Sequence, residues 1–356
     1  MAVITIAGAG MMGTATAYPL ADNGHEVRLL GTHLDGDIIE SCRERHYHPR
    51  LRRDLPRGVQ AYFCDEVAQA LEGAEIIVSG VNSLGVRWVA RTISPYLRPG
   101  QSIIAVTKGL EVAENGDLVI LPDVLKSELP PGVRDNVSIA AIGGPCIAGE
   151  LAGRRPSCVV FGSRDRGAAE RLAAVFRTPY YSVWTTTDLV GLELCAALKN
   201  AYALGAGLVQ GLLEGSGGSD AAGAHMHNLA AAVFAQGCTE IDRVLQLAGA
   251  TRAFAYGLPG AGDLFVTVQG GRTVRLGRLL GLGHRFAEAQ AMLAGETLEG
   301  AAIVRTMGDA LPRLEAREII TTQELPLMRA LVDIIVAGHA ADLALTGVFR
   351  GSAFRS

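Results

Sequence analysis

Lysine is rare in this chain, and its positions are therefore candidates for chemistry. Of the 32 basic residues only Lys108, Lys126 and Lys199 are lysine, which leaves 29 arginines. A desolvated lysine can lose its proton and act as a general acid or base, whereas arginine stays charged. Lys199 and Asn200 follow the apolar residues 194–198, where a charge is costly unless it is paired or can be lost. We predict proton transfer by Lys199; the alternative is a helix-face lysine whose charge reaches solvent.

A second group of chemically capable residues surrounds a glycine-dense loop. Residues 257–264 read GLPGAGDL, and Thr267 and Arg272 follow. Glycines bring backbone close to a neighbour, the planar fork of Arg272 suits a phosphate, and Asp263 can orient a lysine ammonium. Taken alone, the segment is equally well a turn-rich loop before a helix.

The N-terminus carries a nucleotide-binding motif. Gly8, Gly10 and Gly13, with Met11 and Met12 inside the motif, form G-x-G-x-x-G after an apolar run and before a helical pattern. In that context the glycines permit a tight turn and close approach of backbone to a pyrophosphate. We therefore predict a dinucleotide site here.

The choice between NAD and NADP stays open in the sequence. The second strand ends in Leu30-Gly31-Thr32-His33, without an acidic residue for a ribose 2′-hydroxyl and without an adjacent arginine for a 2′-phosphate. Thr32 is a candidate cofactor contact, and NADP is permitted. Asp35 and Asp37 are expected in a surface loop.

The elements that must position these residues change character along the chain. Continuous apolar runs alternate with helical patterns in the first half, which predicts a doubly wound α/β domain with a parallel sheet. Pro19 should disturb the helix expected over 11–23. The predicted strands are 3–7, 26–30, 74–81, 102–107, 137–142 and 157–162.

From Leu189 onward, Ala- and Leu-rich helical patterns dominate. We expect a dinucleotide-binding domain over 1–187 and a mainly α-helical substrate-binding domain over 188–356, with 216–219 as a loop between helices. The most apolar stretch, 201–213, is too short for a bilayer, which takes about 20 residues. The N-terminus does not have the basic region of a signal peptide.

Composition narrows the function classes. Hydrophobic residues make up 49% of the chain, charged residues 19%, and the net charge is −4. These values support a sizeable core and argue against a disordered chain, a nucleic-acid binder or a polybasic membrane binder. Six scattered cysteines without a C-x-x-C pair predict reduced thiols in a cytoplasm.

Several motifs together resemble one known family. Lys108 in VTKG, the segment GPCIAGE at 144–150, Lys199-Asn200, and Gly262–Leu264 with Thr267 and Arg272 are similar in order and spacing to NAD(P)-dependent glycerol-3-phosphate dehydrogenases. The resemblance covers nearly the whole chain, from Gly8 to about Arg305. It implies a Rossmann-type N-terminal domain, a helical substrate domain, a cleft between them, and a homodimer.

The resemblance also implies roles for individual residues. Lys199 corresponds to the general acid/base, and Lys108 to the lysine that polarises the substrate carbonyl. Asp263 and Thr267 correspond to residues around the reacting hydroxyl. The remaining implied contacts are Asn200 and Thr273 to substrate, Arg272 to its phosphate, and Ala148 and Glu299 to the cofactor. The implied reaction is hydride transfer between NAD(P)(H) and dihydroxyacetone phosphate or sn-glycerol 3-phosphate.

The sequence departs from the family near the expected substrate end. Thr273 stands where the family usually has Asn, residues 211–228 look longer than usual, and Val268 and Gln269 differ from the family pattern. These departures keep a second hypothesis open, a dehydrogenase of the same fold acting on another polyol or sugar phosphate. A third hypothesis, a non-catalytic dinucleotide sensor, is disfavoured because a pure binder needs no proton-transfer lysine.

Other candidates have simpler interpretations. His225 and His227, with Asp220, suggest a metal, but residues two apart on a helix point to different faces, so no metal site is predicted. The arginine-rich run 43–53, which includes His46-Tyr47-His48, is expected to be a solvated face. A nucleophilic role for Cys146 would need a histidine partner, and none is nearby in the sequence. Lys126 is expected at the surface.

Overall fold

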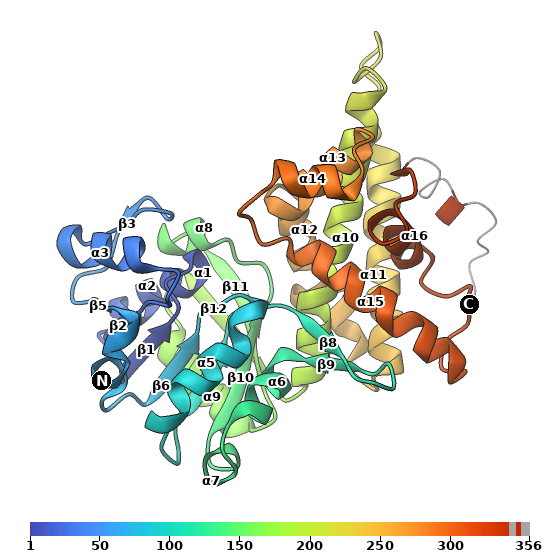
Figure 1. The fold of residues 1–356 in the computed structure, drawn as a ribbon. Helices are drawn as coiled ribbons and strands as arrows, with labels where there is room; N and C mark the ends of the chain where they lie inside the picture. The colour runs from blue at the N-terminus through green and yellow to red at the C-terminus, as the bar shows by residue number, and fades with distance from the viewer. Residues whose placement is uncertain (342–346, 350–356) are drawn as a thin grey trace. The chain divides into compact units, whose positions relative to one another are not determined.

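The chain folds into two compact units in the computed structural model, which describes residues 1–341 and 347–349 (Figure 1). The first unit comprises Met1–Lys108 and Ile120–Glu193, and the second comprises Gly109–Val119 and the chain from Leu194 onward. The domain limits at residues 187 and 188 stay a prediction from the sequence. By packing, the first unit continues to Glu193, within the first turns of helix α10 (Leu189–Gly215).

The first unit is built on an eight-stranded sheet. The strand order is β12-β11-β10-β7-β6-β1-β2-β5, and the six strands from β10 to β5 give the order 3-2-1-4-5-6 of a doubly wound dinucleotide fold. All pairs are parallel except β10 with β11, which is antiparallel and departs from the fully parallel sheet that we expected. The strands are Val3–Ala7 (β1), Glu26–Leu30 (β2), Gln60–Tyr62 (β5), Ile76–Ser79 (β6), Ser102–Ala105 (β7), Ser138–Gly143 (β10), Ser157–Ser163 (β11) and Tyr181–Thr186 (β12).

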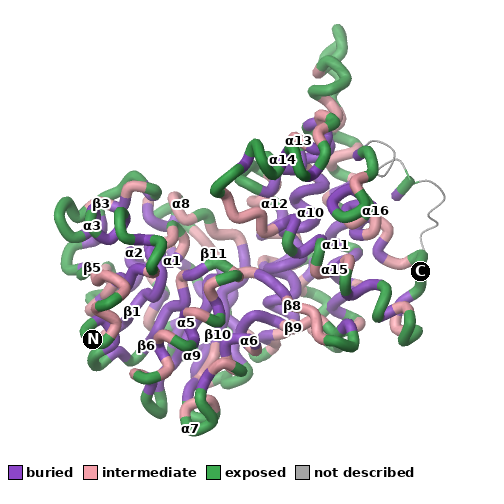
Figure 2. Tube along the Cα trace, in the orientation of Figure 1, coloured by how far each residue is buried: buried purple, intermediate pink, exposed green. Residues whose placement is uncertain are grey.

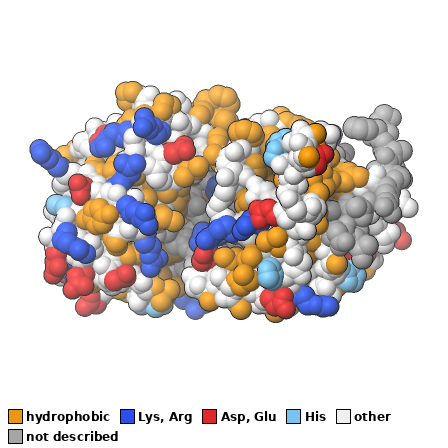
Figure 3. Space-filling model, turned by 90° about the horizontal axis from the view of Figure 1, so that it is seen from above, with side chains coloured by type: hydrophobic (Ala, Val, Ile, Leu, Met, Phe, Trp, Pro, Cys, Tyr) orange, Lys and Arg blue, Asp and Glu red, His pale blue; other side chains and the backbone are white. Residues whose placement is uncertain are grey.

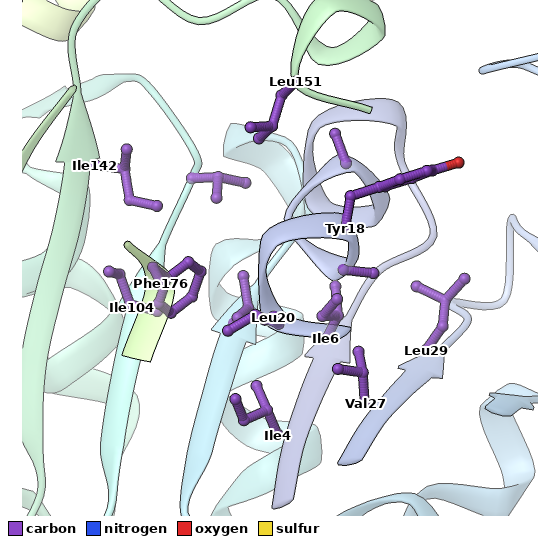
Figure 4. Packing of buried hydrophobic residues seen from close by; sticks show 14 of the residues in the cluster. Ile4, Ile6, Tyr18, Leu20, Val27, Leu29, Ile104, Ile142, Leu151 and Phe176 are labelled. Atoms are coloured by element: carbon purple, nitrogen blue, oxygen red, sulfur yellow. The ribbon is translucent and has the colours of Figure 1, made fainter. Parts of the chain in front are cut away.

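Helices cover both faces of this sheet, as its apolar strands require. On one face, Ile4 and Ile6 of β1 join a buried cluster with Leu20 and Phe176 (Figure 4). On the other face, the hydroxyl of Thr5 donates to the carbonyl of Ala70, 2.5 Å away. The helices of this unit are Met11–Ala15 (α1), Ala17–Asp22 (α2), Gly36–Arg45 (α3), Val67–Leu71 (α4), Val86–Ile93 (α5), Leu121–Glu128 (α6), Pro131–Arg134 (α7), Ala148–Ala152 (α8) and Arg166–Phe176 (α9).

The helix after the glycine motif is interrupted, as Pro19 predicts. It divides at Thr16 into α1 and α2. Proline has no N–H, so the carbonyl four residues earlier has no helical donor at this point. The hydroxyl of Thr16 donates to the carbonyl of Gly13, 2.6 Å away, and satisfies one acceptor at the break.

The second unit is helical and centres on α10. This helix runs for 27 residues, so the apolar stretch 201–213 belongs to a longer helix that could cross a membrane by length and composition alone. However, 89% of its most apolar window is buried inside the structure, and Figure 2 shows its long buried course. The other helices are His227–Leu247 (α11), Asp263–Val268 (α12), Arg272–Gly281 (α13), Phe286–Met292 (α14), Glu299–Ala316 (α15) and Pro326–Ile335 (α16).

A small hairpin that the sequence patterns did not predict belongs to the second unit. Strands β8 (Leu110–Val112) and β9 (Leu118–Ile120) pair with each other, and β8 packs on α15. Arg313 donates to the carbonyl of Ala113 at 3.0 Å, and Arg317 contacts Asp117 at 2.6 Å. A second short pair, Tyr47–His48 (β3) with Arg53–Asp54 (β4), was also not predicted.

Candidate functional site

The glycine motif lies at the point where the strand order of the sheet reverses. Gly8 follows β1 and Gly80 follows the neighbouring β6. A Cβ on Gly8 would lie 2.8 Å from the carbonyl carbon of Gly80, and one on Gly13 would lie 2.9 Å from the Cα of Gly80. A side chain at either position would clash with the backbone of Gly80, so the glycines let the two loops pack closely at the carboxyl ends of the strands, where dinucleotides bind in this fold.

Three other candidate cofactor residues lie within or beside the motif. Met11 and Met12 begin α1, and Met12 packs with Ala148 against the same buried cluster. Ala148 begins α8, which contacts α1. The structure therefore brings Ala148 to the end of the sheet that carries the glycine motif.

Asp35 is a correction to the sequence interpretation. We expected it in a surface loop, but it is buried, and its Oδ2 accepts hydrogen bonds from Ala9 N at 3.2 Å and from Thr32 N and Oγ1 at 2.9 and 2.8 Å. Asp37 is exposed. Asp35 thus ties the end of β2 to the glycine motif, a contact across 26 residues that no local pattern reveals.

His48 is a second correction. The run 43–53 was expected to be solvated, and Arg43 does pair with Glu66 at 2.7 Å. His48, however, is 0% exposed, and its Nε2 lies 2.9 Å from the carbonyl oxygen of Ala9. Both polar groups of the Ala9 backbone are therefore held by buried side chains.

The lysine of the first unit follows β7. The hydroxyl of Thr107 donates to the carbonyl of Val81 at 2.6 Å and ties the ends of β6 and β7 together. Lys108 comes next and is half-buried. It therefore lies just past the carboxyl end of the strand beside β6, on the same edge of the sheet as Gly80.

A buried carboxyl that no sequence pattern singles out interacts electrostatically with this lysine. Glu193 is 0% exposed, and its oxygens make no hydrogen bond within residues 1–341 and 347–349. Burial raises the pKa of Glu193 to about 8, the charge of Lys108 opposes that rise, and Asp123 adds to it. Leu192, beside it, fills the space over Gly143 and Gly162 and holds this turn of α10 on the sheet.

Glu193 should make the stability of the protein depend on pH. Its folded pKa is raised above the ordinary 4.5, so the folded protein keeps a proton that the unfolded chain releases. This contribution is fully present below pH 4.5 and is lost as pH rises through about 8, at up to about 1.4 kcal/mol per pH unit. Urea unfolding at several pH values should show a flatter dependence for Glu193→Gln. The exposed Glu170→Gln should match the wild type; an unchanged slope in Glu193→Gln would contradict the assignment.

The second unit brings three of the predicted catalytic and substrate residues into one group. Lys199 Nζ donates to Asp263 Oδ1 at 2.9 Å and to Thr267 Oγ1 at 2.5 Å. The two charged side chains are 7% and 2% exposed. The Thr267 hydroxyl in turn donates to the carbonyl of Asp263, 2.6 Å away. The prediction that Asp263 orients a lysine ammonium agrees with this geometry.

The sequence folds locally to make this group. The glycine-dense loop forms a π-helical turn, Leu258–Gly262, that runs directly into α12. A Cβ on Gly260 would lie 2.3 Å from the carbonyl oxygen of Ala255, so this turn requires glycine. Asp263 and Thr267, four residues apart on α12, share one face and meet the same lysine.

The predicted phosphate and cofactor residues adjoin this group. A Cβ on Gly300 would lie 2.7 Å from both the Asn200 carbonyl oxygen and the Thr273 side chain, so these three residues are packed together. Arg272, next to Thr273, lies 3.7 Å from Glu299, next to Gly300. Thr273 is buried, whereas Arg272 is exposed.

Close contact between two helices sets the position of α13. Gly207 and Gly211 of α10 face Gly277 and Gly281 of α13. A Cβ on Gly277 would lie 2.2 Å from the carbonyl oxygen of Leu204. Glycines four residues apart on both helices let the backbones touch, and this spacing is a sequence signal for close helix packing.

The longer segment lies far from Lys199, contrary to the expectation that it adjoins the substrate end. The segment begins at Gly211, twelve residue steps along α10 from Lys199, which is about 18 Å of helix. Figure 1 shows this segment as the projecting end of α10 and α11. The rings of His225 and His227 lie 4.9 Å apart rather than on different faces, since His225 precedes α11. Within the described residues, no group of three or more possible metal ligands occurs.

Charged side chains of both signs lie on the face drawn in Figure 3, where several basic ones gather over the first unit. Many arginines pair with carboxylates, including Arg154 with Asp22 at 2.7 Å and Arg164 with Asp123 at 2.5 Å. Lys126 in α6 is half-buried.

Comparison with known proteins identifies relatives along the whole chain. Residues 3–169 match the family profile described as NAD-dependent glycerol-3-phosphate dehydrogenase N-terminus, and residues 188–346 match the corresponding C-terminus. An NADP(+)-dependent glycerol-3-phosphate dehydrogenase of Archaeoglobus fulgidus is 36% identical over 82% of this chain and 83% of its own. A glycerol-3-phosphate dehydrogenase [NAD(P)+] of Shouchella clausii is 33% identical over 95% of this chain and 93% of its own.

Solved structures agree in fold. A glycerol-3-phosphate dehydrogenase from Coxiella burnetii is 28% identical, covers 98% of this chain and 99% of its own, and superposes with a TM-score of 0.81. A ketopantoate reductase from Ralstonia eutropha, 20% identical with a TM-score of 0.55, shares the fold alone. The two matched halves and the relatives that span them show that the chain belongs to the NAD(P)-dependent glycerol-3-phosphate dehydrogenase family.

Proposed function

We propose that the protein interconverts dihydroxyacetone phosphate and sn-glycerol 3-phosphate with NAD(P)(H). The buried group formed by Lys199, Asp263 and Thr267 carries the proposal, because a buried lysine bonded to a carboxylate and a hydroxyl suits proton transfer. The names of the relatives favour this substrate over another polyol or sugar phosphate.

The glycine motif is the proposed site of the dinucleotide. Gly8, Gly10 and Gly13 let this turn pack closely on Gly80, with Met11, Met12 and Ala148 beside it, and a turn without side chains lets backbone approach a pyrophosphate. Thr32 is the proposed contact at the end of β2, and Glu299 the proposed contact from the second unit. When bound, the cofactor supplies or accepts the hydride at substrate C2.

The proton step is assigned to Lys199. In the reducing direction, C2 of the ketone gains a hydride and its oxygen becomes an alkoxide. We assign the proton that this oxygen takes up to Lys199 Nζ, which Asp263 and Thr267 hold in a fixed direction. Lys108 is the proposed second cation that stabilises the developing negative charge.

The substrate phosphate is assigned to the start of α13. Arg272 is exposed and has a long, 3.7 Å ion pair with Glu299, so its fork remains accessible to an anion. Asn200 and Thr273 are the proposed neighbours of the bound substrate. Thr273 fills the space against Gly300, so the family's usual Asn at this position would need a different packing.

A spectrophotometric assay tests the proposal. Oxidation of NADH and of NADPH should be followed with dihydroxyacetone phosphate, with unphosphorylated dihydroxyacetone and with larger keto-phosphates. We expect turnover with dihydroxyacetone phosphate and a much lower kcat/KM without the phosphate. Binding of NAD(P)H without turnover of any of these ketones would support the sensor hypothesis and refute the enzyme assignment.

Replacing Arg272 should separate phosphate binding from proton transfer. Arg272→Met is expected to raise KM for dihydroxyacetone phosphate about a hundredfold with a smaller change in kcat, because a charge-assisted hydrogen bond contributes up to about 3 kcal/mol. Arg278→Met is the control, since Arg278 lies farther along α13 and pairs with Glu214 at 2.6 Å. Equal effects of the two substitutions would rule out a specific role for Arg272.

Compartment and assembly remain proposals. No disulfide joins the six cysteines, all of which lie in the described part of the chain, and this supports a reducing compartment such as the cytoplasm. The homodimer is carried over from the family resemblance, and light scattering coupled to gel filtration tests it.

A further inference from the structure

Ala9, the residue between the first two glycines of the motif, is held from both sides. Its N–H donates to Asp35 Oδ2 at 3.2 Å, and its carbonyl oxygen lies 2.9 Å from His48 Nε2. Asp35 and His48 are both buried. Ala9 cannot turn its peptide groups without breaking one of these contacts.

The hydrogen bonds around His48 define its tautomer. Nδ1 accepts from the N–H of Leu51 at 3.0 Å, so Nδ1 carries no proton. Nε2 therefore carries the proton and donates it to the Ala9 carbonyl. Burial lowers the pKa of His48 and favours this neutral form, although its backbone hydrogen bonds oppose that shift.

The strand pair that carries His48 is itself anchored. His48 ends β3 and pairs with Arg53 of β4. The hydroxyl of Tyr18, in α2, donates to the carbonyl of Asp54 in the same pair at 2.7 Å. The strand pair that carries the donor to Ala9 is thus hydrogen-bonded to α2, the helix that follows the glycine motif.

We propose that His48 is a positioning residue for cofactor binding: its Nε2–H holds the Ala9 carbonyl away from the pyrophosphate and keeps the glycine turn in its binding conformation. Without this hydrogen bond, the turn could rotate the Ala9 carbonyl toward the phosphates, where its negative end would repel them. The proposal rests on the proposed dinucleotide site at the glycine motif. His48 acts through Ala9 and need not touch the cofactor.

Two substitutions separate the two hydrogen bonds of His48. In glutamine the amide nitrogen lies as many bonds from Cα as Nε2, so His48→Gln can still donate to Ala9. In asparagine the amide oxygen lies as many bonds from Cα as Nδ1, so His48→Asn can accept from Leu51 but cannot reach Ala9. His25→Asn is the matched control, because the Nδ1 of His25 accepts from Ala2 N at 3.2 Å, at the amino end of the sheet and away from the glycine motif.

The experiment measures the Kd of NADH and NADPH by fluorescence titration, with urea unfolding of the cofactor-free protein alongside. We expect His48→Asn to weaken binding about tenfold, as for one lost hydrogen bond, with kcat at saturating cofactor little changed. His48→Gln and His25→Asn should keep a Kd within about threefold of the wild-type value, a smaller change than the loss of one hydrogen bond causes.

The remaining outcomes contradict either the proposed role of His48 or the proposed function of the protein. A folded His48→Asn protein with wild-type Kd overturns the proposal, and so does an equal loss in the Gln and Asn variants, which would indicate packing alone. If His48→Asn does not fold, a folded His48→Gln protein with tenfold weaker binding overturns it. Failure of the wild type to bind either dinucleotide would instead refute the proposed function.

Discussion

Replacing Lys199 by methionine is expected to lower kcat by about a thousandfold or more. The methionine side chain is similar in length but carries no proton, and general acid–base catalysis contributes about 10²- to 10⁴-fold. The glycine motif belongs to the first unit and Lys199 to the second, so the Kd of NAD(P)H should stay near the wild-type value. Single-turnover reduction and fluorescence titration check the two parts.

The same substitution should also destabilise the fold, for a separate reason. Asp263 is 2% exposed, and without Lys199 its carboxylate is left without its cation. Breaking one side of a buried ion pair costs about 3–5 kcal/mol, whereas replacing both sides costs much less. The double variant Lys199→Met/Asp263→Asn should therefore recover most of the free energy of unfolding and remain inactive. Recovery of activity together with stability would contradict the assignment of Lys199 to proton transfer.

Gly277→Ala is expected to be among the most damaging single-methyl additions in the second unit. The new Cβ would lie 2.2 Å from the Leu204 carbonyl oxygen and 3.0 Å from the Gly207 Cα. Both obstacles are backbone, so α10 and α13 must separate. We expect a loss of about 3 kcal/mol or more in the free energy of unfolding, the upper range for overpacking.

Activity should fall in the same variant. Arg272 and Thr273 begin α13, and Thr273 packs beside the Asn200 carbonyl of α10 through Gly300. Separation of the helices would shift the phosphate end of the site relative to Lys199. KM for dihydroxyacetone phosphate should therefore rise, and thermal unfolding should report the lost stability.

Gly215→Ala is the matched control on α10. A Cβ there would meet its nearest neighbour, the Gly281 carbonyl oxygen, at 3.8 Å, an ordinary contact. The alanine should leave stability unchanged or raise it by up to about 1 kcal/mol, because glycine is a poor helix former. A Gly277→Ala protein as stable as Gly215→Ala would show that the helices adapt without cost.

The sequence predicted the parts of the fold that local pattern determines. Apolar runs located β1, β2, β6, β7, β10 and β11, and Pro19 predicted the break at Thr16. Strand direction was harder, because the antiparallel pairing of β10 with β11 depends on how the chain returns to the sheet. The short strands β3, β4, β5, β8 and β9 have too few residues to show a period.

The candidate site divides in the same way. The sequence suggested that Asp263 orients a lysine ammonium, and the ion pair of Lys199 with Asp263 agrees with this, because a buried charge is costly without a partner. Asp35 and His48 could not be found from local pattern, because they meet Ala9 across 26 and 39 residues. Glu193 is given no role from the sequence, because an acidic residue near the start of a helix is ordinary and only its burial distinguishes it.

The hairpin on α15 has a consequence for dividing the gene. The chain leaves the first unit after Lys108, contributes residues 109–119 to the second, and returns at Ile120. A single stop codon or a single start codon therefore cannot encode either unit intact. An N-terminal fragment would carry the hairpin without α15, and a C-terminal fragment would expose the surface of α15 that Arg313 and Arg317 use to hold it. Separate expression of complete units would require moving the hairpin sequence from one fragment to the other.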